Sequence, residues 1–153
     1  MVKIVNRGGY NRLELTLGVG PGRANNIDDV TYVQFLLNKI VQADANLALR
    51  QMCKPHDKKL VVDGIIGPKT KTQIKAFQRH VKTYNKGIIA DGCVDKYGLN
   101  VSDKEHRYTF FALIMEVMFV CPCSLAGLVN EPDFPPRLAA IGRAVYNSNP
   151  SDA

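Results

Sequence analysis

One short stretch, residues 63 to 81, constrains the fold of this chain more than any other, because a tight turn runs directly into an amphipathic helix. The stretch opens with Asp63-Gly64, and Gly67-Pro68 follows. Aspartate accepts hydrogen bonds from the backbone N–H groups after it, and proline suits the first helical position, where an N–H has no partner within the helix. The apolar face that comes next consists of Thr70, Ile74, Phe77 and Val81. These spacings predict a turn followed by a helix that begins near Pro68 and ends between residues 84 and 87.

Two further elements are predicted before this stretch. Residues 11–19 alternate between apolar and polar side chains, which is typical of a half-buried strand, and residues 3–6 can pair with them. A glycine-rich loop follows at 18–22. Asp28 or Asp29 can then cap a helix that runs to about Asn46. The apolar positions of this helix form one stripe, namely Val30, Val33, Leu37, Ile40 and Val41.

Two more helices are predicted in the C-terminal third. Ser102 and Glu105 have the spacing of a capping box, which places a helix start near Asp103. From 110 to 120 this helix is apolar on nearly every side apart from Glu116, so we expect the rest of the fold to bury it. Prolines at 135 and 136 open a last helix over about 136–146. The chain is therefore expected to be α+β, mainly α, with a short N-terminal β-hairpin and a C-terminal helical extension.

The composition agrees with one folded domain and narrows the class of partner. The chain has 153 residues, 46% of them hydrophobic, and a net charge of +6. Residues 50–86 hold ten basic and two acidic side chains, a balance of +8, whereas residues 90–153 hold five basic and eight acidic ones, a balance of −3. A carboxylate-rich polymer would be drawn to the basic part, more weakly as salt rises. Basic and aromatic residues do not interleave as in nucleic-acid-binding segments, so nucleic acid is not an expected partner.

The sequence also bears on location and on metal chemistry. The first nine residues lack the apolar run of a secretory signal, and the most apolar stretch, 109–121, is too short to span a bilayer as a helix. We therefore expect synthesis in the cytoplasm and no membrane insertion. The spacing of the four cysteines is not that of a zinc site, and neither a metal nor a cofactor is expected; they are Cys53, Cys93, Cys121 and Cys123.

Three motifs together resemble the peptidoglycan-binding domain found beside bacterial cell-wall hydrolases. The first is Asp63-Gly64-x-x-Gly67-x-x-Thr70, followed by Phe77-Gln78. Upstream, residues 29–38 read D-V-x-x-V-Q-x-L-L-N, which is similar to the first helix of that family. Downstream, Asp91-Gly92 resembles its second Asp-Gly turn, although Asp95 stands where the family has glycine and no threonine-led helix start is evident.

The resemblance implies a compact three-helix unit over residues 25–100, in which the two Asp-Gly turns open the second and third helices. Residues 1–24 would form the hairpin packed on it, and residues 101–153 the helical extension of the same globule. Turn and capping physics favour a structural role for the motif residues Asp63, Gly64, Gly67, Thr70, Phe77, Gln78, Asp91 and Gly92. Ligand contact falls to groups expected to be exposed beside the first turn and at helix ends, namely Lys69, Lys71, Gln73, Tyr84 and Tyr97. Lysines there can pair with stem-peptide carboxylates, and a tyrosine can stack on a sugar.

These features predict a non-catalytic protein that binds peptidoglycan and brings itself or a partner, such as a hydrolase, to the wall after lysis or delivery by a secretion machine. One alternative is a protein–protein interaction module of a phage or a type VI secretion system, with an effector, adaptor or immunity role. A small muramidase is another, with Glu116 as general acid and Asp103 or Glu131 as the second carboxylate. Otherwise Glu116 would face solvent or pair with Arg137 or Arg143.

Overall fold

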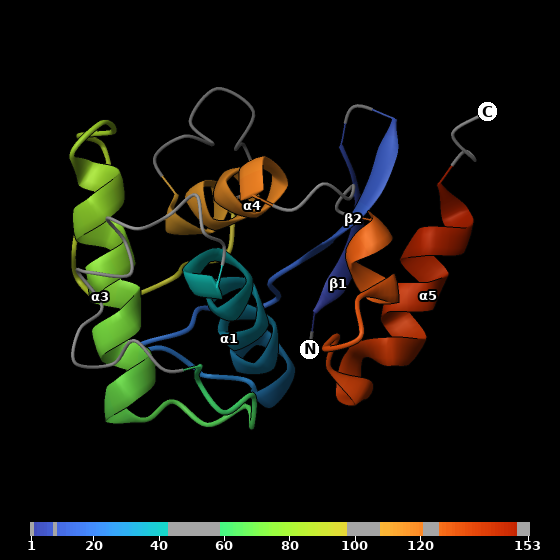
Figure 1. Ribbon diagram of the computed structural model, residues 1–153, viewed down its shortest axis with the longest axis horizontal. Helices are drawn as coiled ribbons and strands as arrows, with labels where there is room; N and C mark the ends of the chain where they lie inside the picture. The colour runs from blue at the N-terminus through green and yellow to red at the C-terminus, as the bar shows by residue number, and fades with distance from the viewer. Residues whose placement is uncertain (1, 8, 43–58, 98–107, 121–125, 150–153) are drawn as a thin grey trace.

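The computed structural model describes residues 2–7, 9–42, 59–97, 108–120 and 126–149, and Figure 1 shows how its elements are arranged. Two strands come first, β1 (Lys3–Arg7) and β2 (Tyr10–Glu14). The α-helices of the described residues are α1 (Ile27–Gln42), α3 (Pro68–Lys82), α4 (Thr109–Val120) and α5 (Ala139–Ser148). Two short 3₁₀ helices, η3 (Ala126–Asn130) and η4 (Pro136–Leu138), lie between α4 and α5. The fold is α+β and mainly α, as predicted.

The N-terminal hairpin is confirmed, but its second strand is shorter than predicted. β1 and β2 pair antiparallel, from Lys3 opposite Glu14 to Arg7 opposite Tyr10. The predicted strand to residue 19 stops at Glu14 because the next backbone donors turn away from the sheet. The N–H groups of Thr16 and Leu17 donate instead to the buried carboxylate of Asp29, at 3.0 and 3.1 Å.

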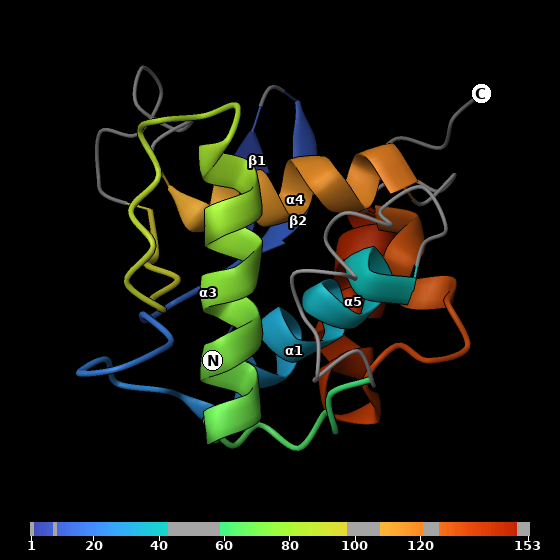
Figure 2. The same cartoon turned by 60° about the vertical axis from the view of Figure 1, so that its left-hand side comes forward.

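The helix α1 forms the centre of the core. Its predicted apolar stripe is buried, yet so are Tyr32, Phe35 and Leu36 on other faces. The predicted stripe therefore covered too little of the helix surface, because α3, α4 and η4 contact α1 from different directions (Figures 1 and 2). The predicted end of this helix near Asn46 lies outside the described residues.

The C-terminal helix covers the hairpin. α5 contacts both strands and η3, and Figure 1 shows it beside the hairpin, on the opposite side of α1 from α3. Asn149 fixes the end of α5 to β2, since its side-chain amide accepts from the N–H of Asn11 at 2.6 Å and donates to the Asn11 carbonyl at 2.8 Å. The predicted helix over 136–146 is confirmed, with η4 forming its first turn.

Burial of α4 on nearly every side is not observed. Phe110, Leu113 and Val117 face the core, but a second face leaves Met118 and Phe119 exposed. The described neighbours of α4 reach only its inner side, where α1 packs against it. The predicted helix start near Asp103 lies outside the described residues. None of the described helices has the length and hydrophobicity required to cross a bilayer.

The buried carboxylate of Glu14 and two arginines of the hairpin should make stability depend on pH. Glu14 is buried; burial alone would raise its pKa, but hydrogen bonds from Arg7 and Arg12, at 2.8 and 3.0 Å, outweigh burial and hold the pKa below that of a free glutamate. A carboxyl with a lowered folded-state pKa stabilises the protein above its unfolded pKa and loses this effect as pH falls. Glu14→Gln should therefore reduce the free energy of unfolding more at pH 7 than at pH 3 in urea denaturation. An equal loss at both pH values would contradict this.

Candidate binding surface

A buried glutamine of α1 closes the first Asp-Gly turn. The side-chain Nε2 of Gln34 donates to Asp63 Oδ1 and the Ile65 carbonyl, both at 3.1 Å, and to Thr70 Oγ1 at 3.2 Å. Its Oε1 accepts from the backbone N–H groups of Asp63 and Gly64, at 3.1 and 2.9 Å. One side chain therefore holds the turn and the first turn of α3 together.

A buried glutamine of α3 closes the second turn in the same way. Nε2 of Gln78 donates to Asp91 Oδ1 at 3.1 Å, to the Cys93 carbonyl at 2.8 Å and to Thr109 Oγ1 at 3.0 Å. Its Oε1 accepts from the N–H of Gly92 at 2.8 Å. Thr109, at the start of α4, thus accepts from Gln78 as Thr70, at the start of α3, accepts from Gln34.

The two turns share their backbone geometry as well as their partners. Each aspartate accepts from the N–H two residues later, which is Ile65 in the first turn and Cys93 in the second, at 2.9 and 2.8 Å. Gly64 and Gly92 have φ values of 73° and 79°, a left-handed conformation that glycine adopts without strain. We call each arrangement a glutamine-closed turn. The same turn geometry therefore occurs twice in the motif region. The sequence analysis did not predict the hydrogen bonds of the two glutamines.

The motif residues of the first turn lie in the turn itself, at the start of α3 and in the core. The N–H of Ile65 holds the pKa of Asp63 below its usual value, and Pro68 stands at the start of α3 directly after Gly67. Phe77 is buried in the core. α3 ends at Lys82, two residues before the predicted range. Both closing glutamines are buried, whereas the carboxylates of Asp63 and Asp91 are exposed at the surface of the turns.

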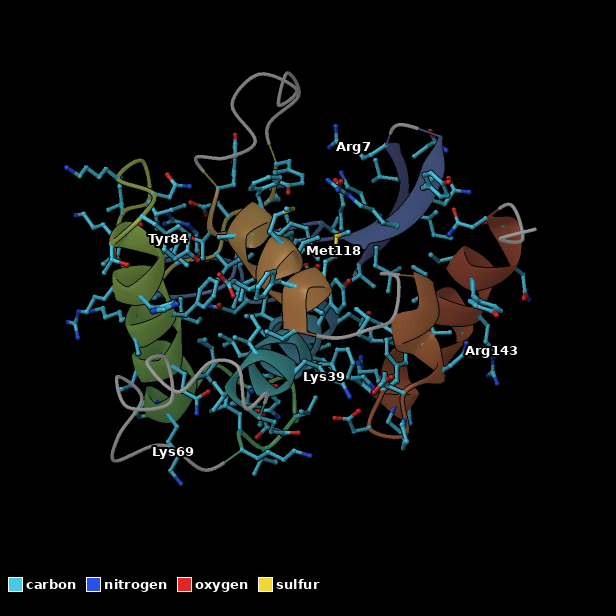
Figure 3. The ribbon with its side chains drawn as sticks, turned by 45° about the horizontal axis from the view of Figure 1, so that its top comes forward. Arg7, Lys39, Lys69, Tyr84, Met118 and Arg143 are labelled. Carbon is cyan, nitrogen blue, oxygen red and sulfur yellow. The ribbon has the colours of Figure 1, made fainter. Side chains whose placement is uncertain are left out.

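Basic side chains line the outer face of α3. Four of them follow one another at intervals of three or four residues, which places them on one side of the helix over about 17 Å. These four are Lys71, Lys75, Arg79 and Lys82, and together with Lys86, which lies four residues beyond the end of the helix, we call them the α3 cation row. Lys71 is half-buried and the others are exposed. Lys69 precedes the row, and Figure 3 shows it at the start of α3, pointing away from the other elements.

Most basic side chains elsewhere in the described chain form ion pairs, and the members of the row do not. Arg23 pairs with Asp95 at 2.5 Å, and Lys39 pairs with Glu131 at 2.7 Å. Within the described residues, no member of the α3 cation row takes part in an ion pair. The row is therefore a local concentration of positive charge that remains available to an external anion.

Two of the five predicted contact residues are not exposed. Lys69 and Tyr84 are exposed and Lys71 is half-buried, but Gln73 and Tyr97 are only 1% and 7% exposed. Gln73 lies one turn after Thr70 on the buried face of α3. Tyr97 packs against the rings of Tyr108 and Phe110, beneath two arginines of the hairpin. The expectation that Gln73 and Tyr97 are available to a ligand was wrong.

Glu116 has a different partner from those predicted. The phenol of Tyr84 donates a hydrogen bond to it, across the gap between α3 and α4. Burial and this hydrogen bond both raise the pKa of Tyr84, so the phenol keeps its proton. Arg137 pairs instead with Asp28 at 2.5 Å. Of the two carboxylates proposed to assist Glu116 in a muramidase, Glu131 is engaged with Lys39 and Asp103 lies outside the described residues.

The described residues do not gather three or more metal-ligating side chains at one place. Cys93 is buried, and burial raises the pKa of its thiol, which keeps it protonated. The remaining cysteines, as well as His56 and His106, lie outside the described residues. The part of the chain that the structure describes therefore offers charge and aromatic side chains, rather than metal ligands, for binding.

Comparisons with protein-family models, with curated proteins and with solved structures gave no match to this chain. The likeness to the peptidoglycan-binding domain therefore rests on the motif residues of the sequence alone and stays a prediction.

Proposed function

We propose that this protein binds bacterial peptidoglycan without catalysing a reaction, and that the α3 cation row is the main contact. The observation that carries the proposal is the cation row itself, none of whose members forms an ion pair with another described residue. The opposite face of α3 is buried, and both closing glutamines bond inside the protein. The cation row is thus an exposed, positively charged part of this motif region that a carboxylate can reach.

The spacing of the row suits a polymer with repeated carboxylates. Neighbouring side chains along the row are about 5–6 Å apart at their Cβ atoms. An exposed ion pair contributes little, about 0–1 kcal/mol, so one stem peptide held by one lysine would bind weakly. Several pairs formed along one polymer strand bind together, because each contact raises the effective concentration of the next. Binding should accordingly weaken as salt screens the charges.

Removal of three central members of the row should reduce binding. We expect Lys75→Gln, Arg79→Gln and Lys82→Gln together to lower the fraction of protein that sediments with purified insoluble sacculi at least fivefold at low salt. The three side chains are exposed, so the variant should keep the helical circular dichroism of the wild type. The measurement is sedimentation across a salt series, which should also release the wild-type protein at high salt.

The chain offers a control with the same change in charge. Lys3, Lys96 and Arg143 are exposed on other elements, and replacing all three with glutamine also removes two lysines and one arginine. This variant should keep most of the binding. An equal loss in both variants would show that net charge, and not the row, is responsible. Wild-type protein that stays in the supernatant at low salt would overturn the proposed function.

A protein–protein interaction role is the second proposal, for a phage or type VI secretion system. It is favoured by the exposed apolar side chains on the outer face of α4, which are Met115, Met118 and Phe119. Exposed apolar groups that lie together are typical of interaction sites. This role predicts no sedimentation with sacculi, so the same experiment separates the two proposals.

A further inference from the structure

We propose that the junction between α3 and α4 is a subsite for the uncharged sugar backbone of a glycan strand, with Tyr84 and Phe119 as stacking rings and Glu116 as a hydroxyl acceptor. This inference rests on the proposed function and assigns a second, separate part of the ligand. The cation row would hold carboxylates, whereas the junction would hold the sugar chain that carries them.

The geometry of the junction begins with Tyr84. The residue follows the last turn of α3, and Figure 3 shows it on the side of that helix nearer α4. Tyr84 is 60% exposed although its hydroxyl bonds to Glu116. The rings of His80 and Tyr84 are nearly perpendicular, with 5.8 Å between their centroids. The hydrogen bond and the histidine restrict the position of the tyrosine, and its exposed part can meet a ligand.

Phe119 supplies a second ring on α4. It lies one helical turn after Glu116, which places the two Cβ atoms about 5–6 Å apart on the same side of the helix. Phe119 is 83% exposed, the highest value among the large apolar side chains of the described residues. The core does not require a ring at this position, because α4 is anchored by Phe110, Leu113 and Val117. Glu116 is therefore bonded to one exposed aromatic residue and lies one helical turn from another.

This combination matches the chemistry of a sugar ring. A pyranose has apolar C–H faces and hydroxyl groups at its rim, and the negative face of an aromatic ring attracts such weakly positive C–H groups. A carboxylate accepts hydrogen bonds from hydroxyls more strongly than a neutral acceptor does. Rings that contact the faces, with a carboxylate at the rim, can thus hold an uncharged saccharide.

The charges around the junction favour a neutral sugar chain over an acidic peptide as its ligand. Glu116 makes no ion pair within the described residues, and its charge would oppose an acidic peptide laid against the rings. Lys82 and Lys86 lie on either side of Tyr84 in the sequence and end the cation row. A neutral glycan with carboxylates on side branches satisfies both conditions, because its sugars meet the rings while its branches reach the lysines.

The test uses an uncharged ligand, a β-1,4-linked oligomer of N-acetylglucosamine without stem peptides. Wild-type protein should bind it to the same extent in low and high salt, as measured by NMR chemical-shift titration. Phe119→Ala and Tyr84→Ala should each weaken binding at least fivefold. Tyr84→Phe should retain most of the binding, because it keeps the ring and removes only the bond to Glu116. The controls are Tyr10→Ala and Tyr146→Ala, which remove exposed rings elsewhere and should change nothing.

The outcomes separate this inference from the proposed function. Wild-type protein that sediments with sacculi but does not bind the oligomer would overturn the subsite and leave the proposed function in place. Oligomer binding that survives both Phe119→Ala and Tyr84→Ala would also overturn the subsite, since the sugar would then bind elsewhere. Loss in these two variants, with unchanged binding in the controls, would establish it even if the cation row proved unnecessary.

Discussion

Gln78→Ala should lower the free energy of unfolding by about 3 kcal/mol, because it leaves several buried polar groups without partners and each costs about 1–3 kcal/mol. The groups affected are the N–H of Gly92, the Cys93 carbonyl and the hydroxyl of Thr109. Some will find water or each other, so the total should stay below the sum of the separate costs. Gln34→Ala should cost a similar amount, because its side chain makes the corresponding bonds at the first turn.

Urea denaturation measures this effect, and the neighbouring residue provides the control. Arg79→Ala changes an exposed side chain of the same helix and should alter stability by less than about 0.5 kcal/mol. A Gln78→Ala variant that lost no more than this control would show that the glutamine-closed turn contributes little to stability.

Gln78→Glu tests the hydrogen bonds without a change in packing, since the two side chains have nearly the same size. An ionised carboxylate cannot donate, yet it would face Asp91 Oδ1 and the Cys93 carbonyl, both of which accept from Nε2 in the native protein. The buried site should raise the pKa of the new carboxyl in the folded state. Relative to wild type, the variant should therefore be least destabilised at acidic pH, where the carboxyl is protonated, and the difference should grow as pH rises. Stability relative to wild type that did not depend on pH would contradict this reasoning.

The turn and start of α3 could be predicted because the physics that produces them is local. Asp63 bonds to a backbone group two residues away, Gly64 needs only its own φ, and Pro68 acts at its own position. Such effects can be read from neighbouring residues in the sequence. The hairpin and the helix predicted over 136–146, which is η4 and α5 in the structure, could be predicted for the same reason.

The closing bonds could not be predicted, because they join residues that are distant in sequence. Gln78 and Thr109 are 31 residues apart, and Gln34 and Asp63 are 29 apart. A polar residue on a helix is usually assigned to the solvent side, and this reasoning also placed Gln73 outside. The expected structural role of Gln78 therefore named no partner for it, and Gln73 was placed at the surface although it is buried.

The repeat explains why function is expected on one face of α3. This helix contributes Thr70 to the first glutamine-closed turn and Gln78 to the second, so both turns require its inner face. Substitutions on that face would disturb two turns at once. The outer face, with the exposed members of the cation row, takes part in neither glutamine-closed turn, which is why the proposed ligand contact is placed there.

The two turn glycines should respond differently to alanine, although their φ values are nearly equal. A left-handed φ alone costs a residue with a Cβ about 1–2 kcal/mol. At Gly92 the nearest group to an added Cβ is the end of the flexible Lys75 side chain, at 3.2 Å from Cε, which can move aside. Gly92→Ala should therefore cost little more than the backbone term, about 1–2 kcal/mol.

At Gly64 the same added Cβ has no room. It would lie 2.8 Å from both the Ile27 carbonyl oxygen and Thr31 Oγ1, and closer still to Ile27 Cγ1. These atoms belong to the first turn of α1, where Thr31 Oγ1 already bonds to the Ile27 carbonyl, so relief requires a shift of the helix against the turn. Overpacking of this kind adds about 1–3 kcal/mol to the backbone term. Gly64→Ala should thus cost about 3 kcal/mol or more in urea denaturation, clearly above Gly92→Ala, and equal losses at the two positions would contradict the close packing of the first turn on α1.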